Sequence, residues 1–150
     1  MYPKWHIILG AIFTLVLWAF FPGTEWYFML VLFLSSFLID FDHYMTFVWK
    51  KGSWSLSEAI DYCEKQKEIM IAEQRRGIFV KGDFHLFHTV EFHAVVLALG
   101  FVYPVFMYVF AGMVFHSLSD FVDLTYKHEI YRREFFLSNW IRTHLHRERR

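Results

Sequence analysis

Four long apolar runs divide the sequence, and they occur as two closely spaced pairs. Pro22 and Gly23 form a turn signal within the first pair, and a short break ending at Pro104 separates the members of the second. A helix needs about 20 apolar residues to cross a bilayer, and each run approaches that length. The pattern therefore predicts four membrane-spanning helices. We place them at about residues 5–21, 25–44, 84–103 and 104–123.

The second run is short in its strictly apolar part, which extends only from Trp26 to Ile39. It reaches the length of a span only if Asp40, Asp42 and His43 continue the same helix. We therefore expect one continuous helix with these ionisable residues at its polar end.

Two polar segments complete the chain. In the first, Ser55 and Glu58 have the spacing of a capping box, and Gly77 is a natural stop. A helix is therefore expected over about 56–76, lying on the bundle or on the cytoplasmic membrane surface rather than binding a partner. The basic, amphipathic tail, residues 124–150, indicates an interfacial helix.

Composition supports the membrane assignment. Of the 150 residues, 56% are hydrophobic and 22% are aromatic, which is more apolar material than one small soluble core can bury. The length indicates one domain, residues 1–150, and the fold class is an all-α integral membrane protein.

The net charge is +0, so nothing indicates nucleic acid as a partner. The single cysteine, Cys63, excludes an internal disulfide and a thiolate zinc cluster.

The distribution of basic residues sets the orientation. All 15 Lys and Arg lie in residues 1–4, 45–83 or 124–150, and the two loops near Pro22 and Phe101 carry none. The positive-inside rule therefore places both termini and the central segment in the cytoplasm. We expect a protein of the cell membrane with an even number of spans, because an odd number would scatter the basic residues over both faces.

Ionisable side chains inside these runs mark the candidate chemistry. The stretch FHLFHTVEFH, residues 84–93, holds three histidines and one carboxylate, and Asp40 and His116 lie in two other runs. Counted at about 1.5 Å per residue, Asp40, His88 and His116 lie about 18 to 21 Å from the far side of the bundle. Ionisable groups at one depth on three helices indicate a functional site on the cytoplasmic side, because their burial in lipid is costly.

The spacings of these residues favour chelation of a metal ion. His116 and Asp120 are four residues apart and share a helix face, as do Asp40 and His43 at a spacing of three, whereas Asp42 points elsewhere. In the third run, steps of three separate His85, His88 and Glu91, which would keep them on one side of a helix. The candidates from the three runs are Asp40, Asp42, His43, His85, His88, Glu91, His116 and Asp120.

This donor set suits a divalent transition metal. Imidazole nitrogens and carboxylate oxygens without a thiolate are typical ligands of zinc, iron or manganese. The candidates outnumber the ligands of one catalytic zinc, so one or two ions are compatible with the pattern. Whether His93, Asp123 and Glu91 bind metal or only support its ligands is left open, and His6 is interpreted as an isolated polar residue. A structural polar network is the alternative to a metal site.

The motifs resemble those of a known family, the YdjM-like integral-membrane metal-dependent hydrolases. That family has a P-D-I-D-H-type motif after an early span, a histidine pair before a helical hairpin, and an H-x-x-x-D at the end of the hairpin. The counterparts here, within residues 26–123, are Ile39-Asp40-Phe41-Asp42-His43, then His85 and His88-Thr89, then His116 to Asp120.

The resemblance implies an activity and a role for each residue. A metal-activated water would attack an ester or phosphoester, with zinc as the first choice of metal. Asp42 and Glu91 would be the catalytic carboxylates, or together with His43 and His85 they would complete a second metal site. The metal ligands that the resemblance implies are Asp40, His43, His85, His88, His116 and Asp120.

The depth of the site favours a membrane lipid or another amphiphile as substrate. Its acyl chains would stay in the bilayer while the polar bond reaches the metal. A homo-oligomer is compatible with the sequence. Three alternatives stay open: a haem-binding protein with axial ligands among His43, His88 and His116, a metal carrier, and a structural membrane subunit.

Overall fold

Helices make up the whole architecture of the part of the chain that the structure describes. The structure is a computed structural model, and it describes residues 3–147. It contains no strand in that range, which confirms the predicted all-α class. The α-helices are α1 (Pro3–Phe20), α2 (Trp26–Leu38), α3 (Phe41–Lys51), α4 (Leu56–Arg75), α5 (Val90–Gly100), α6 (Val105–Tyr126) and α7 (Leu137–Arg147). Two short 3₁₀ helices are η1 (Leu86–His88) and η2 (Ile130–Arg132).

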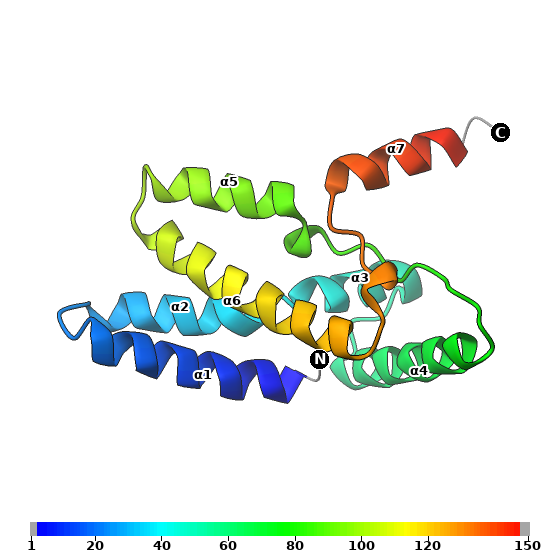
Figure 1. Ribbon diagram of the computed structural model, residues 1–150, viewed down its shortest axis with the longest axis horizontal. Helices are drawn as coiled ribbons and strands as arrows, with labels where there is room; N and C mark the ends of the chain where they lie inside the picture. The colour runs from blue at the N-terminus through cyan, green and yellow to red at the C-terminus, as the bar shows by residue number, and fades with distance from the viewer. Residues whose placement is uncertain (1–2, 148–150) are drawn as a thin grey trace.

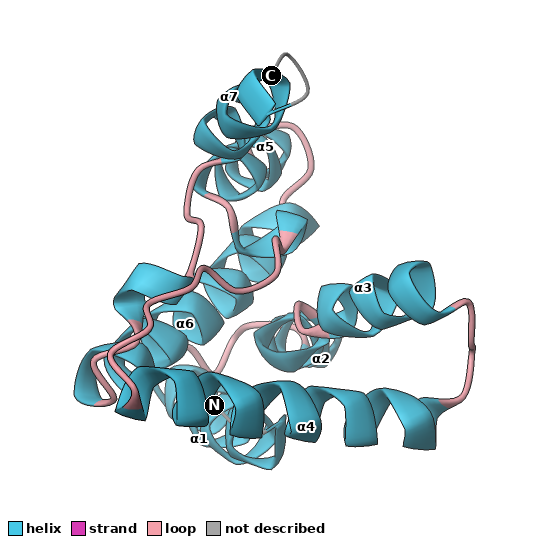
Figure 2. Ribbon diagram, turned by 90° about the vertical axis from the view of Figure 1, so that its right-hand side faces the viewer, coloured by secondary structure: helices cyan, strands magenta, loops and turns pink. Residues whose placement is uncertain are grey.

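Helix α6 is the centre of the arrangement. It packs against α1, α2 and α5, so the two hairpins α1–α2 and α5–α6 meet along it. The turns of both hairpins lie at one end of the molecule, and α3 and α4 lie at the other (Figure 1). In the perpendicular view, α5 and α7 lie on one side of α6 and α1 lies on the other (Figure 2). The four apolar runs thus pair into two hairpins with neighbouring turns.

Two glycines let the helices approach closely enough to assemble the site. A Cβ atom at Gly112 of α6 would collide with Ser35 Oγ and would lie 2.5 Å from the Leu32 carbonyl oxygen. At Gly10 of α1, a Cβ would collide with Ser36 Oγ. Small residues permit backbone contact between helices, as in membrane helix pairs. Both α1 and α6 therefore pack closely against the C-terminal half of α2.

Gly112→Ala is expected to destabilise the fold, although alanine is ordinarily favoured over glycine in a helix by about 1 kcal/mol. The added methyl group would press on the α2 backbone, and overpacking of this kind costs about 1–3 kcal/mol. Gly23→Ala is the matched control, because no atom lies within 4 Å of its new Cβ. Thermal unfolding in detergent measures both variants, and an unchanged midpoint for Gly112→Ala would contradict the packing.

The helix predicted between the second and third runs is present as α4. The Ser55 side chain accepts a hydrogen bond from the Glu58 N–H at 3.4 Å, which is one half of the capping box. Beyond Arg75 the chain turns at Gly77, whose φ of +73° is the left-handed conformation that glycine adopts easily. Local capping signals therefore account for both ends of this helix.

The second apolar run bends before it reaches the length of a span. Helix α2 ends at Leu38, α3 begins at Phe41, and the two are bent by 42°. At the bend the Asp40 N–H bonds at 3.2 Å to the Phe37 carbonyl, three residues back rather than four. The expectation of one continuous helix through Asp42 is therefore wrong, and Asp40 occupies the bend.

The third apolar run contains a shorter helix than predicted. Thr89 follows η1 in an extended conformation, and its hydroxyl accepts a hydrogen bond from an N–H of the next turn, so α5 begins only at Val90. A threonine that caps a helix has an extended backbone. The preceding segment therefore cannot continue into that helix without a break. Consequently His85 and Glu91 do not share a helix face, contrary to the spacing argument.

At most two segments among the described residues have the length and apolarity of a membrane span. Helix α6, with 22 residues, meets the criterion alone, and α2 and α3 meet it only as a bent pair. Helix α1 is apolar but shorter. Helix α5, with 11 residues, extends about 17 Å against a hydrocarbon core of about 30 Å. This is a weak indication of membrane association, and the four predicted spans are not confirmed.

The basic tail folds back on the bundle before it forms its helix. The Phe135 carbonyl accepts a hydrogen bond from the Val90 N–H at 2.9 Å, and Trp140 of α7 stacks on Phe84 with ring centroids 4.4 Å apart. The tail therefore lies beside the segment that carries the histidines. Residues 148–150 of the predicted tail lie outside the described residues.

Candidate metal centre

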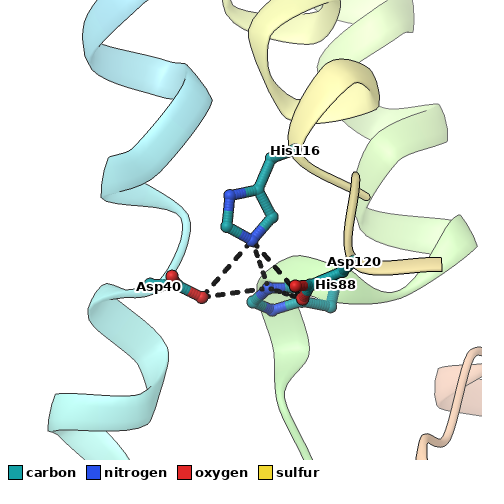
Figure 3. A group of neighbouring side chains, drawn as sticks. All are labelled: Asp40, His88, His116 and Asp120. Atoms are coloured by element: carbon teal, nitrogen blue, oxygen red, sulfur yellow. Dashed lines mark hydrogen bonds and ion pairs between the residues drawn. The ribbon is translucent and has the colours of Figure 1, made fainter. Parts of the chain in front are cut away.

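Four ionisable side chains meet where the α2–α3 bend, η1 and α6 come together. Asp40 lies at the bend, His88 in η1, and His116 and Asp120 on successive turns of α6 (Figure 3). One donor atom from each lies within 4.8 Å of the other three. Asp40 is half-buried and the other three residues are buried. The structure therefore brings together residues of three runs that the sequence places at one depth.

The distances between the donor atoms are those of a coordination sphere. His116 Nε2 lies 3.2 Å from His88 Nε2 and 3.3 Å from Asp40 Oδ1. Asp120 Oδ2 lies 3.6 Å from His116 Nε2 and 4.0 Å from His88 Nε2, and Asp40 Oδ1 lies 3.5 Å from His88 Nε2. Two ligands of a tetrahedral ion with bonds of about 2.1 Å are separated by about 3.4 Å. The four residues are therefore able to hold one metal ion.

Buried partners set the orientation of both imidazoles. His116 Nδ1 lies 2.9 Å from the Ser36 carbonyl oxygen, and His88 Nδ1 lies 3.0 Å from Asp42 Oδ2. Because each Nδ1 faces an acceptor, it carries the proton of the neutral ring, and each Nε2 lone pair points into the cluster. Two lone pairs 3.2 Å apart repel each other unless a proton or a metal ion lies between them. The orientation of both rings is therefore compatible with a bound metal ion.

Asp42 holds His88 in place. Its Oδ2 accepts hydrogen bonds from His88 Nδ1 and, at 3.1 Å, from the Phe87 backbone N–H, and the residue is 6% exposed. A carboxylate behind a ligating histidine fixes the ring and raises its basicity. Asp42 therefore positions the His88 ring, and its predicted catalytic role stays a prediction. The bend at Asp40 turns Asp42 toward η1.

His43 and His85 lie beside the cluster and contact each other, with ring centroids 3.7 Å apart. His43 Nε2 lies 3.5 Å from Asp40 Oδ1, and His85 Nδ1 lies 3.6 Å from Asp42 Oδ1. Asp42, His43 and His88 also form a second group whose donor atoms lie within 4.8 Å of one another. The two predicted ligands His43 and His85 thus adjoin the four-residue cluster without belonging to it.

Glu91, which the sequence suggests as a catalytic carboxylate, lies outside the site. It accepts hydrogen bonds from the backbone N–H groups of Leu137 and Ser138 at 2.9 and 3.0 Å, and from Ser138 Oγ at 2.8 Å. It therefore caps the start of α7, where a negative charge also interacts favourably with the helix dipole. The helical spacing on which the prediction depended is absent, because α5 starts after His88.

His93 and Asp123 also lie outside the cluster. His93 Nδ1 donates to the Thr89 carbonyl at 2.9 Å, and its Nε2 lies 3.1 Å from Ser117 Oγ. Asp123 forms an ion pair with Lys127, one turn later in the chain. Each of these side chains has its own partner, and neither belongs to the metal-binding group.

His6 is a residue of the site that sequence reasoning missed. Its ring stacks on His116 with centroids 3.9 Å apart, the residue is 2% exposed, and its Nε2 lies 3.1 Å from Asp120 Oδ1. A signal was present, because His6 precedes the end of its run at Phe21 by 15 residues. That is about 22 Å, close to the depth of the other candidates. Helix α1 is thus a fourth contributor to the site.

Arg133 is the second residue that sequence reasoning missed. It lies between η2 and α7, and its Nη2 donates a hydrogen bond to Asp120 Oδ2 at 2.7 Å. Nothing in the sequence distinguishes it from the other arginines of the tail, since its position depends on the tail folding back. It adds a permanent positive charge beside the Asp120 carboxylate.

No protein-family model matches the sequence, and no curated protein or solved structure is significantly similar to it. The site itself presents two imidazoles and two carboxylates at the spacings of metal ligands. A buried carbonyl and a buried carboxylate hold the imidazoles in the ligating tautomer. This arrangement is able to hold a divalent metal ion.

Proposed function

We propose that this protein is a membrane hydrolase that uses a divalent metal ion to cleave an ester or phosphoester. The observation that carries the proposal is the buried contact of His88 with His116, whose Nε2 atoms converge at 3.2 Å beside two carboxylates. The resemblance of the sequence motifs to the YdjM-like metal-dependent hydrolases supports the same activity. The first choice of metal is zinc, because two nitrogens and two oxygens suit it, with manganese or iron as alternatives.

The proposed ligands are Asp40, His88, His116 and Asp120. A divalent ion held there would supply Lewis-acid chemistry, making water nucleophilic at neutral pH and polarising the bond to be cleaved. Ser36 and Asp42 hold the two rings by their Nδ1 atoms. The imidazoles therefore need little rearrangement to accept the ion.

Arg133 favours a phosphoester as the substrate. Its guanidinium group bonds to Asp120 at the edge of the cluster and lies near the proposed ligands. Guanidinium groups carry several N–H donors in a planar fork and bind phosphate oxygens strongly. A phosphate at the site would therefore meet a positive charge supplied by the chain itself.

An apolar groove beside the cluster supports a substrate with an acyl chain. The groove has a volume of about 310 Å³ and is lined by α2, α5 and α6 together with residues that flank them. Ile39 and Phe87 line it and immediately precede Asp40 and His88 in the chain, so the groove lies close to the site. The other lining residues are Val31, Leu34, Ser35, Leu38, Phe92, Val109 and Met113. Apolar walls beside a polar centre suit a lipid or another amphiphile.

We further propose that the protein lies in the cell membrane with four spans and with the site on the cytoplasmic side. Large apolar side chains are exposed on α1, α5 and α6, among them Leu15 at 63%, Val95 at 57% and Val122 at 67%. Exposed apolar surface on three helices supports contact with lipid. The absence of Lys and Arg from the loops near Pro22 and Phe101 supports the orientation.

The close contact between the two histidines disfavours the haem alternative. Axial haem ligands bind the iron from opposite faces of the macrocycle. His88 Nε2 and His116 Nε2, 3.2 Å apart with Asp40 beside both, leave no room for a macrocycle between them.

Metal-dependent hydrolysis tests the proposed function. Purified protein in detergent, loaded with zinc, is expected to cleave nitrophenyl phosphodiesters or nitrophenyl acyl esters, and EDTA should abolish the cleavage. Zinc bound at stoichiometric level without hydrolysis of either class, or of phospholipid, would favour the non-catalytic metal-binding alternative. A Soret band in the purified protein would favour the haem alternative.

In the same assay, acyl-chain length tests the groove. Val109→Trp narrows the groove and is expected to slow cleavage of octanoyl esters about tenfold or more, since each methylene kept in water forfeits about 0.8 kcal/mol. Acetyl esters should be cleaved at the wild-type rate. Val95→Trp is the matched control, because Val95 lies on the exposed surface of α5 and outside the groove. Equal losses for acetyl and octanoyl esters would argue against an acyl-chain site.

A further inference from the structure

Asp42 and His85, beside the four-residue cluster, each carry a buried polar atom that lacks a hydrogen bond. Among the described residues, neither Asp42 Oδ1 nor His85 Nδ1 has a hydrogen-bond partner. They lie 3.6 Å apart, which is too long for a hydrogen bond between them. A buried carboxylate oxygen without a donor is costly, and such atoms in a native structure call for a ligand or a water molecule. The two atoms therefore indicate an additional binding position.

His43 completes the surroundings of this position. Its ring packs on His85 with centroids 3.7 Å apart, and one of its ring nitrogens lies within 4.8 Å of donor atoms of Asp42 and His88. His43 Nε2 lies 3.5 Å from Asp40 Oδ1, so this distance and the 3.6 Å between Asp42 and His85 both match the spacing of ligands on one ion, about 3.4 Å. Two imidazoles and a carboxylate are again the donor set of a divalent metal.

Asp40 connects this position with the first site. Its Oδ1 lies 3.3 Å from His116 Nε2, 3.5 Å from His88 Nε2 and 3.5 Å from His43 Nε2. No other carboxylate oxygen among the described residues approaches histidines of both groups in this way. A carboxylate that lies between two sets of histidines is able to bind two ions at once, one in each set.

We propose that Asp42, His43 and His85 form a second divalent-cation site, with Asp40 shared between the two ions. This inference rests on the proposed function, because the first ion occupies the site of Asp40 with His88 and His116. Paired ions about 3.5–4 Å apart stabilise both the attacking and the leaving oxygen of a phosphoryl transfer. A second ion therefore favours a phosphoester over a carboxylic ester as the substrate. It is the more weakly held ion, because the His43 side chain is 36% exposed whereas that of His116 is fully buried.

Metal content per chain tests the second site. Elemental analysis of the full-length protein, equilibrated with zinc and separated from free ion, is expected to give two ions for wild type. His85→Ala and His43→Ala should each give one ion, with unchanged helical content by circular dichroism. His93→Ala is the matched control and should keep two ions, because His93 bonds to Ser117 outside both groups.

The possible outcomes separate this inference from the proposed function. One ion in wild type and in both variants overturns the second site and leaves the first intact. Two ions in wild type and in both variants overturn the assignment of His43 and His85. No ion in wild type overturns the first site and the second together.

In manganese-loaded protein, an exchange-coupled electron paramagnetic resonance signal is expected in wild type and not in His85→Ala. An uncoupled wild-type signal would contradict a shared Asp40.

Discussion

Replacing His116 with alanine is expected to abolish stoichiometric zinc binding at the four-residue cluster. His116 Nε2 lies 3.2–3.6 Å from donor atoms of three other residues, so its removal takes away the ligand that faces all of them. Residues that only support metal ligands change metal affinity by about 10- to 100-fold, and loss of a ligand should exceed that range. Competition with a chromophoric chelator measures the change in the dissociation constant.

Matched variants distinguish loss of a metal ligand from a general disturbance of the fold. Asp120→Asn, which keeps the size of the side chain but removes its charge, should also weaken zinc binding strongly. Glu91→Gln makes the same change in the α5 carboxylate that caps α7. This variant should bind zinc as wild type does. His93→Ala is the corresponding control for His116→Ala. Loss of zinc from Glu91→Gln, or retention of full affinity in His116→Ala, would refute the assignment of ligands.

Zinc is expected to stabilise the folded protein by about 2.7 kcal/mol when the free ion is about 100-fold above its dissociation constant. The donor atoms of Asp40, His88 and His116 are far apart in the sequence and come together only on folding. The ion therefore binds the folded state in preference to the unfolded chain, and its binding free energy adds to the stability of the fold.

Unfolding in detergent at increasing zinc concentrations measures this linkage. The midpoint should rise with zinc in wild type and in Glu91→Gln, and it should fall after treatment with EDTA. His116→Ala should show little response, because it lacks the ligand set. A midpoint independent of zinc in wild type would show that the cluster is a structural polar network, the alternative that the sequence leaves open.

Local patterns determined a large part of the architecture. The four apolar runs indicated two helical hairpins, because turn signals at Pro22 and Pro104 interrupt them. The serine at position 55 and the glycine at position 77 set the ends of α4 through interactions within a few residues. The spacing of four between His116 and Asp120 placed both on one face of α6, because helix geometry alone decides that relation.

Depth along the helices determined which runs would meet. In antiparallel hairpins whose turns lie at one end, residues equally far from the turns come to the same level, as do Asp40, His88 and His116. The same count brings His6 close to this level, although it is the single ionisable residue of its run.

Tertiary structure decided which carboxylates and which arginine reach the site. Asp42 faces His88 because the chain bends at Asp40, and Glu91 faces α7 because a threonine cap delays the start of α5. Arg133 reaches Asp120 only because the tail folds back over the bundle. The sequence by itself determined the helices, their pairing and the depth of the ligands, since these depend on local periodicity and length. The direction in which each side chain points depended on the exact helix starts, on the bend at Asp40 and on distant partners, which meet only when the helices pack.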